Sequence, residues 1–216
     1  MGPAFPTIVG SGPNTCILHY RDNTRVIGES DLVLVDAGAE LDLYAADVTR
    51  TFPASGSFTD EQCAIYEVVL AAHQSAIQAV RPGATVESVH NTARNVLVDG
   101  LLGLNVLYGS REELIAEESY KPFFPHQTSH WLGLDVHDVG DYRCGERSRA
   151  LEPGMVLTVE PGLYFPPTLL EETDYSGIGI RIEDDVVVTS DGHDVITEGL
   201  PVTVDELEVL IGGGCE

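Results

Sequence analysis

Five side chains in this sequence have the types and surroundings expected of metal ligands. They are Asp36, Asp47, His130, Glu160 and Glu183. Each of the four acids lies on or beside a short run of valine, leucine and isoleucine, and the histidine lies in the stretch S-H-W-L-G-L-D-V-H-D-V-G. A carboxylate at the end of an apolar strand must be paired, protonated or bound to a cation, because an unpaired buried charge costs several kcal/mol. Together these residues predict a metal site.

The chemistry expected of such a site is hydrolysis. A ligand set of carboxylates and one imidazole suits Mn²⁺, Co²⁺, Fe²⁺ or Zn²⁺ better than copper. Four carboxylates carry more negative charge than one dication neutralises, whereas two dications about 3.5 to 4 Å apart would balance it and lower the pKa of a shared water to near neutrality. We therefore expect two divalent ions, with Mn²⁺, Co²⁺, Fe²⁺ and Zn²⁺ as the candidates.

Other catalytic devices lack their motifs in this sequence. It contains no G-x-S-x-G, H-E-x-x-H or G-x-x-x-x-G-K-[ST] motif, and no G-x-G-x-x-G follows a strand pattern. Its four cysteines are far apart and show no C-x-x-C spacing, which argues against a zinc knuckle or a redox dithiol. We expect these cysteines to be reduced.

The charge of the chain excludes some partners. Its 11 Lys and Arg residues against 35 Asp and Glu residues give 11 − 35 = −24. A field this negative repels nucleic-acid phosphates and anionic lipids, so neither nucleic acid nor a membrane is an expected partner. The chain opens with no signal-peptide pattern and contains no apolar run near the roughly 20 residues that span a bilayer. We expect a cytoplasmic protein.

Short apolar runs predict the strands that position the acids. The run 32–35 ends at Asp36, and the segment 44–52 follows after a turn, so the two predict a hairpin that brings Asp36 and Asp47 into one space. We also expect a strand at 17–20 (I-L-H-Y). Near the other end, the run 155–159 precedes Glu160, and the alternating segment 178–182 precedes Glu183.

Helical patterns fill the middle of the chain. Thr59 with Gln62 predicts a capping box before a helix that ends at Arg81-Pro82-Gly83, and Ser110 with Glu113 predicts another before a short helix. Further helices are expected at about 86–102 and 204–211. We interpret His73 and His90 as ordinary helical histidines. Strands, then a block of helices, then strands favour an α+β domain.

Two heptapeptides indicate an internal duplication. The segments L-V-L-V-D-A-G (32–38) and V-L-T-V-E-P-G (156–162) share four largely apolar residues, one carboxylate, one small or cyclic residue and one glycine. Each is followed by a second carboxylate on a strand. The chain is therefore expected to contain two related halves.

Seven segments, in order, resemble one known family. They are I-V-G-S-G-P-N (8–14), I-L-H-Y (17–20), D-A-G (36–38), D-V-T-R-T-F-P (47–53), S-H-W-L-G-L-D-V-H-D-V-G (129–140), L-T-V-E-P-G-L-Y (157–164) and G-I-G-I-R-I-E-D-D (177–185). The chain resembles the catalytic domain of the bacterial aminopeptidase P branch of the pita-bread metallopeptidases, which include prolidase and methionine aminopeptidase. The resemblance implies a curved, mostly antiparallel sheet with helices on its outer face and an internal pseudo-twofold.

The resemblance also implies a role for each site residue. Asp36 would hold one metal, Asp47 and Glu183 would bridge both, and His130 and Glu160 would complete the other. A hydroxide bridging the metals would attack the scissile carbonyl, with Glu160 as the proton carrier. By the same resemblance, His19 and His137 would hydrogen-bond the substrate or its tetrahedral intermediate. His126, Tyr164 and Arg181 would line the pocket and support the site.

The activity that the resemblance implies is release of the first residue from peptides with proline in second position. An imide bond before proline has no N–H and bends the chain, so it needs a dedicated pocket. The alternatives are an Xaa-Pro dipeptidase (prolidase) and a non-catalytic interaction domain or inactive fragment of the fold. We interpret residues 1–216 as one catalytic domain that lacks the first helix and N-terminal domain of its relatives, which puts the expected homo-oligomer in doubt.

Overall fold

The strands form a layer with one three-stranded antiparallel sheet from each half of the chain. The computed structural model describes residues 1–170 and 173–213. The first sheet has the order β2-β3-β6, with β2 at Ile8–Ser11, β3 at Leu32–Ala37 and β6 at Val48–Pro53. The second has the order β13-β12-β9, with β9 at Val156–Val159, β12 at Asp184–Val188 and β13 at His193–Val195. The predicted pairing of the segments around Asp36 and Asp47 is confirmed, since Asp36 lies opposite Thr49.

Shorter strands complete the layer and its edges. Strands β10 (Gly162–Tyr164) and β11 (Gly179–Arg181) form an antiparallel pair, with Gly162 opposite Arg181. Two further groups lie at the periphery: β1 (Gly2–Pro3), β4 (Ala39–Leu41) and β5 (Tyr44–Ala45), and the hairpin of β7 (Arg143–Cys144) and β8 (Arg147–Ser148).

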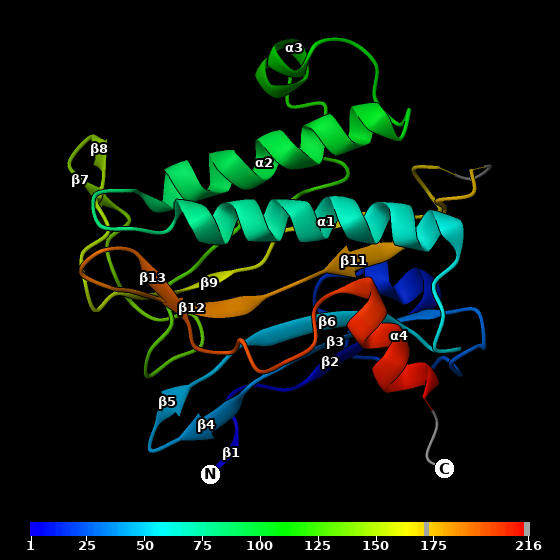
Figure 1. Ribbon diagram of the computed structural model, residues 1–216, viewed down its shortest axis with the longest axis horizontal. Helices are drawn as coiled ribbons and strands as arrows, with labels where there is room; N and C mark the ends of the chain where they lie inside the picture. Colours follow the sequence, from blue (N-terminus) through cyan, green and yellow to red (C-terminus); the bar gives the residue numbers. More distant parts are fainter. Residues whose placement is uncertain (171–172, 214–216) are drawn as a thin grey trace.

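Helices cover one face of this layer. Helices α1 (Asp60–Ala79) and α2 (Val86–Gly103) lie side by side above the strands in Figure 1, α3 (Arg111–Ala116) follows them, and α4 (Val204–Gly212) packs against β6 and α1. The predicted capping boxes of Thr59 with Gln62 and Ser110 with Glu113 are both present. None of the helices in the described residues is long and apolar enough to cross a membrane.

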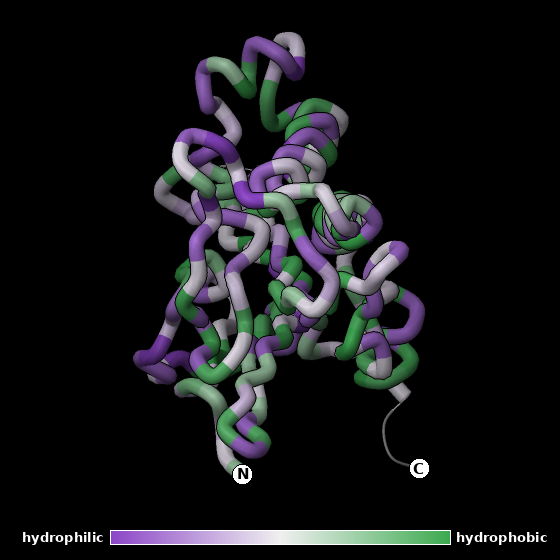
Figure 2. The backbone as a smooth tube through the Cα atoms, turned by 90° about the vertical axis from the view of Figure 1, so that its left-hand side faces the viewer, coloured by the Kyte–Doolittle hydropathy of each residue, from purple (hydrophilic) through white to green (hydrophobic). Residues whose placement is uncertain are grey.

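Amphipathic elements build the core between the two layers. Hydrophobic and hydrophilic residues alternate along the tube in Figure 2 through helices and strands alike, as expected for elements with one buried face. One apolar cluster includes Tyr66, Leu101 and Phe124, and a second includes Leu157 and Val186. The core thus holds α1 and α2 rigidly against the strands that carry the acids.

The prediction of a strand at 17–20 is wrong. Strand β2 ends at Ser11, and a 3-10 helix, η1 (Gly12–Cys16), follows it. Gly12 has a φ of 52°, and Pro13 at the start of η1 supplies a φ suited to a helical turn, so the chain turns away from the sheet. Cys16, Cys63 and Cys144 form no disulfide, as expected, and Cys215 lies outside the described residues.

Candidate metal centre

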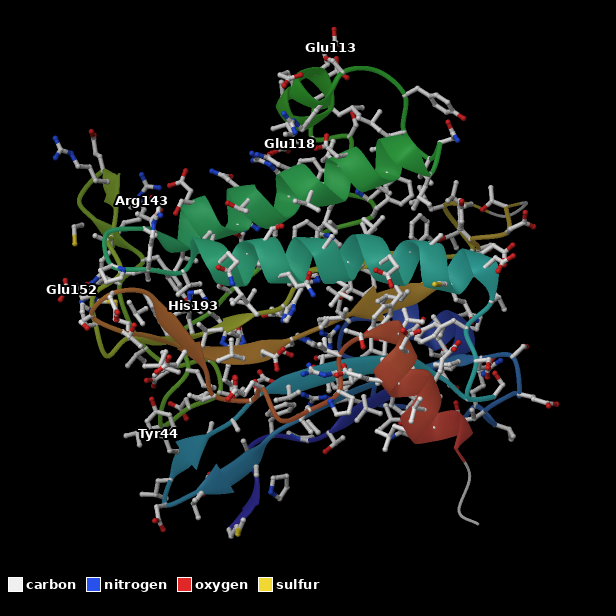
Figure 3. The ribbon with its side chains drawn as sticks, in the orientation of Figure 1. Tyr44, Glu113, Glu118, Arg143, Glu152 and His193 are labelled. Atoms are coloured by element: carbon white, nitrogen blue, oxygen red, sulfur yellow. The ribbon has the colours of Figure 1, made fainter. Side chains whose placement is uncertain are left out.

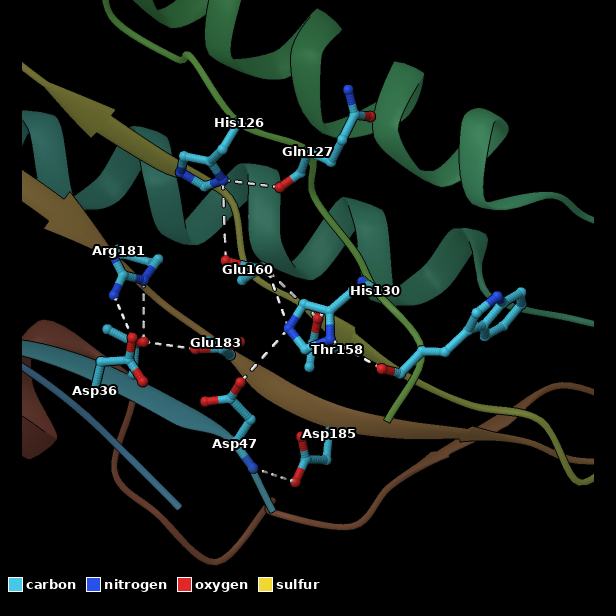
Figure 4. Close-up of polar contacts among 12 residues, drawn as sticks. Asp36, Asp47, His126, Gln127, His130, Thr158, Glu160, Arg181, Glu183 and Asp185 are labelled. Atoms are coloured by element: carbon cyan, nitrogen blue, oxygen red, sulfur yellow. Dashed lines mark hydrogen bonds and ion pairs between the residues drawn. The ribbon is translucent and has the colours of Figure 1, made fainter. Parts of the chain in front are cut away.

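The five predicted ligands line one cleft of about 790 Å³ between the two halves. Asp36 lies in β3 and Asp47 directly precedes β6, so both come from the first sheet. Glu160 directly follows β9, Glu183 lies between β11 and β12, and His130 comes from the segment between α3 and β7. Figure 4 shows their side chains pointing toward one another. The acids at strand ends therefore converge as the sequence predicts.

Three of these side chains form a closely spaced group. Ligand atoms of Asp47, His130 and Glu183 all lie within 4.8 Å of one another. The Nε2 atom of His130 lies 3.5 Å from Asp47 Oδ2 and 3.5 Å from Glu160 Oε1. The fifth residue, Asp36, lies at the side of this group, where its Oδ2 accepts a hydrogen bond from Arg181 Nη2 at 2.6 Å.

The donor atoms of this cluster fit a cation. Oδ1 of Asp36 and Oδ1 of Asp47 are buried, and neither has a hydrogen-bond partner within residues 1–170 and 173–213. Buried carboxylate oxygens without partners are rare and call for a specific reason. Carboxylate oxygens and an imidazole nitrogen are also donors that hard and borderline divalent ions accept. The residues present therefore fit the divalent metals expected from the sequence.

Burial and mutual repulsion disturb the acids of the cleft. Burial raises the pKa of Glu160 from 4.5 to about 7, and the nearby charge of Asp47 adds to this effect. Burial likewise raises the pKa of Asp36 from 3.8 to about 6, although Arg181 opposes the shift. For Glu183, burial and the charge of Glu160 raise the pKa well above its ordinary value. Without a cation, the cleft therefore retains protons near neutral pH.

These pKa values predict that the metal-stripped protein is more stable at pH 5 than at pH 8. Between about 4 and 7, the folded state holds protons on Asp36 and Glu160 that the unfolded state has lost, so the free energy of unfolding falls as the pH rises. We expect the Tm in chelator to be higher at pH 5 by roughly a few °C. Saturating Mn²⁺ should narrow the difference, because a cation favours the deprotonated acids. A Tm in chelator that is higher at pH 8 than at pH 5 would contradict the raised pKa values of Asp36 and Glu160.

The orientation of His130 suits a ligand. Its Nδ1 lies 3.0 Å from the Trp131 carbonyl oxygen and donates to it, which leaves Nε2 facing Asp47 and Glu160. Burial lowers its pKa, but the hydrogen bond to Asp47 and the charge of Glu160 outweigh burial and leave the pKa raised.

A chain of hydrogen bonds supports the cleft behind the acids. His126 Nδ1 donates to the Gln127 carbonyl oxygen at 2.8 Å, so its Nε2 accepts from the Tyr164 hydroxyl at 2.9 Å. That hydroxyl in turn accepts from Arg181 Nη1 at 3.2 Å. Burial lowers the pKa of His126 to about 3 and raises that of Tyr164 to about 12, so both side chains are neutral. His126 and Arg181 line the cleft, whereas Tyr164 lies buried behind them.

The two remaining predicted histidines also line the cleft. The rings of His137 and His130 meet edge to face, with 4.4 Å between centroids. Burial, and then the neighbouring His130, lowers the pKa of His137, so it is a neutral hydrogen-bonding group. His19 lies in the turn after η1, and its side chain is exposed to the cleft.

Several further cleft residues could not be identified from the sequence. His90, interpreted as an ordinary helical histidine, lines the cleft from α2, and its Nδ1 lies 2.9 Å from Thr128 Oγ1. Figure 3 shows Arg143 on the β7–β8 hairpin beside the start of α2, where Ser148 donates a hydrogen bond to Glu87. The hairpin and α2 thus close one end of the cleft. No motif marks these residues, because their chain segments meet only in the folded protein.

Comparison with known proteins identifies the class of protein. The model of metallopeptidase family M24 matches residues 1–190, and the chain belongs to this family. The chain is 50% identical to the Xaa-Pro aminopeptidase of Escherichia coli over 209 residues, which are 97% of this chain and 47% of that protein. It is 43% identical to the Haemophilus influenzae Xaa-Pro aminopeptidase, covering 97% of this chain and 48% of that protein. The chain thus spans about half the length of these curated relatives.

Solved structures agree with this assignment. The structure of Pseudomonas aeruginosa aminopeptidase PepP matches with a TM-score of 0.96 and 51% identity, over 98% of this chain and 48% of that one. A variant of Escherichia coli aminopeptidase P in complex with substrate matches with a TM-score of 0.94 and 48% identity, over 98% of this chain and 48% of that one. The expected α+β pita-bread fold is confirmed.

Proposed function

We propose that this chain is a metal-dependent aminopeptidase that releases the first residue from peptides with proline in second position. The observation that carries the proposal is the convergence of four acids and one histidine from both halves of the chain on one cleft. The similarity to Xaa-Pro aminopeptidases at 50% and 43% identity supports the choice of substrate. Peptide substrates, location in the cytoplasm and self-association belong to the same proposal.

The five cleft residues would hold two divalent ions, with Mn²⁺ as the first candidate. In this assignment Asp36 would help to hold one ion, His130 and Glu160 would help to hold the other, and Asp47 and Glu183 would be shared between them. The unpartnered Oδ1 atoms of Asp36 and Asp47 support these roles. Bound divalent ions polarise a carbonyl and lower the pKa of water, which is the chemistry that peptide hydrolysis needs.

The other cleft residues would handle protons and hold the peptide. Glu160, with a pKa of about 7, can accept a proton from water and return it to the leaving nitrogen at neutral pH. The imidazoles of His19 and His137 can donate hydrogen bonds to the carbonyl oxygen as negative charge develops there. Arg181 orients Asp36, and Tyr164 with His126 fixes Arg181 from behind.

The shape of the cleft is compatible with a short peptide. Its volume of about 790 Å³ falls within the roughly 300 to 1,000 Å³ of ordinary ligand pockets. The acids lie within it, and the β7–β8 hairpin closes one end.

The test is metal-dependent hydrolysis of matched peptides. The metal-stripped chain is incubated with an Xaa-Pro-Xaa tripeptide, an Xaa-Ala-Xaa tripeptide and an Xaa-Pro dipeptide, each with and without Mn²⁺, and released amino acid is measured. We expect Mn²⁺-dependent release of the first residue from the proline tripeptide, at least ten times faster than from the alanine tripeptide, about 1.4 kcal/mol of discrimination.

Each other outcome has a distinct meaning. Hydrolysis confined to the dipeptide would indicate an Xaa-Pro dipeptidase instead. Tight metal binding without hydrolysis of any peptide would contradict a peptidase activity of this chain. Absence of metal binding would favour an interaction domain.

A further inference from the structure

Side chains, more than a strand ladder, connect the two halves of the molecule. We use the term seam for the region where β6 and residues 179–185 run side by side (Figure 1). One backbone hydrogen bond crosses it near the acids, from Glu183 N to Thr49 O at 3.1 Å. Farther along, Thr51 Oγ1 donates to Arg181 O at 2.9 Å and accepts from Arg181 N at 3.2 Å. The spacing of the halves therefore depends on the side chains in the seam.

The seam separates two of the proposed metal ligands. Asp47 belongs to the first half and Glu183 to the second, so a small shift at the seam changes the distance between their carboxylates. On the cleft side, Asp185 Oδ2 accepts a hydrogen bond from Asp47 N at 3.1 Å, and Thr49 Oγ1 donates to Glu183 Oε2 at 2.6 Å. These contacts orient the ligands, but they do not hold the two strands together from the side opposite the cleft.

Arg50 provides that connection. Its side chain is 11% exposed. Nη1 donates to Thr49 O at 3.0 Å and to Glu183 O at 2.7 Å, so one nitrogen joins both strands. Nη2 donates to Asp184 Oδ1 at 2.8 Å and Nε donates to Pro201 O at 2.9 Å. The guanidinium therefore ties Glu183, a proposed ligand, and its neighbour Asp184 to β6.

We propose that Arg50 is a positioning residue that holds Asp47 and Glu183 at the separation that metal binding requires. The inference rests on the proposed metal-binding function. The planar guanidinium holds its N–H donors in a fixed geometry, and here these donors bond to acceptors in different segments of the chain. A lysine has its charge at a single atom and cannot reach Glu183 O, Asp184 and Pro201 O together.

The test is Mn²⁺ binding, measured by calorimetric titration of the metal-stripped Arg50→Lys variant and of the metal-stripped wild type. We expect the affinity for Mn²⁺ to fall by about 10 to 100-fold, the usual effect of removing a residue that orients metal ligands. The control is Tyr66→Phe, which removes the hydrogen bond of 2.7 Å from the Tyr66 hydroxyl to Val202 O, near the loop that Arg50 contacts at Pro201. We expect Tyr66→Phe to lower the Tm in chelator while leaving the Mn²⁺ affinity within about twofold.

The outcomes separate this inference from the proposed function. Wild-type affinity in Arg50→Lys overturns the inference alone, and so does an equal loss in Tyr66→Phe, because general loosening would then explain it. A wild-type chain that binds no Mn²⁺ overturns the metal-binding function and the inference together. If Arg50→Lys does not fold, Asp184→Asn is tested instead. Asparagine has the shape of aspartate but lacks its charge, so it weakens the hydrogen bond that Arg50 Nη2 donates to residue 184. We expect a smaller loss of affinity in that variant, and wild-type affinity there would overturn the inference.

Discussion

Replacing Asp47 by alanine is expected to lower kcat/KM for peptide hydrolysis by roughly 10³-fold and to remove most Mn²⁺ binding. Asp47 belongs to the closely spaced group with His130 and Glu183, and its buried Oδ1 has no hydrogen-bond partner in the described part of the chain. We propose that this residue contacts both metals, so alanine would disturb two sites at once. A loss of about 4 kcal/mol of transition-state stabilisation corresponds to roughly a 10³-fold fall in kcat/KM.

The measurement is kcat/KM for the Xaa-Pro-Xaa tripeptide with Mn²⁺, together with metal content after dialysis. The matched control is Asp194→Ala on β13, an exposed aspartate that should leave both quantities unchanged. If Asp47→Ala retained more than a tenth of the wild-type kcat/KM, the assignment of Asp47 as a shared ligand would be wrong.

Replacing Arg181 by methionine is expected to destabilise the metal-stripped protein by about 3 to 5 kcal/mol, because it leaves buried acids without their cation. Arg181 is 3% exposed, and its Nη2 donates to Asp36 Oδ2 at 2.6 Å. Burial alone would lower its pKa, but the phenol oxygen of Tyr164 and the carboxylates of Asp36 and Glu183 raise it, so Arg181 stays protonated. Methionine fills a similar volume and removes only the charge and the hydrogen bonds.

Urea unfolding at pH 7.5 in chelator measures this effect. Arg111→Met is the control, because Arg111 pairs with Asp99 at the surface and its side chain is 42% exposed, so little change is expected. Mn²⁺ should stabilise Arg181→Met more than the wild type, since the ions would supply the missing positive charge. A change in unfolding free energy no larger than that of Arg111→Met would mean that Arg181 does not neutralise the acids.

The convergence of the five proposed ligands could be predicted from sequence because the signal of the acids is local. Asp36 and Glu160 each end an apolar run, and each lies near the end of the strand that this run forms, since Asp36 is the next-to-last residue of β3 and Glu160 directly follows β9. The capping box of Thr59 with Gln62 is likewise complete within four residues, and the structure confirms it. Most of the predicted strands and helices rested on local patterns of this kind.

Features that depend on segments far apart could not be predicted. His73 was interpreted as an ordinary helical histidine, but it is buried, and its Nε2 lies 3.1 Å from Asp184 Oδ2 on the second sheet. The contacts of Arg50 across the seam are equally non-local. The wrong strand at 17–20 has another cause, since the short apolar segment favoured a strand while Gly12 and Pro13 before it favour a turn. There the turn chemistry outweighed the apolar pattern.

The seam also bears on how the molecule folds. Each three-stranded sheet can close with partners from its own half, whereas the seam joins residues more than a hundred positions apart, such as Thr49 and Glu183. Contacts of such large sequence separation form slowly, because closing a long loop costs entropy before the contact repays it. The chain therefore becomes able to bind metal only when its two halves dock at the end of folding. The rate of metal uptake during refolding would then measure the rate of that last step.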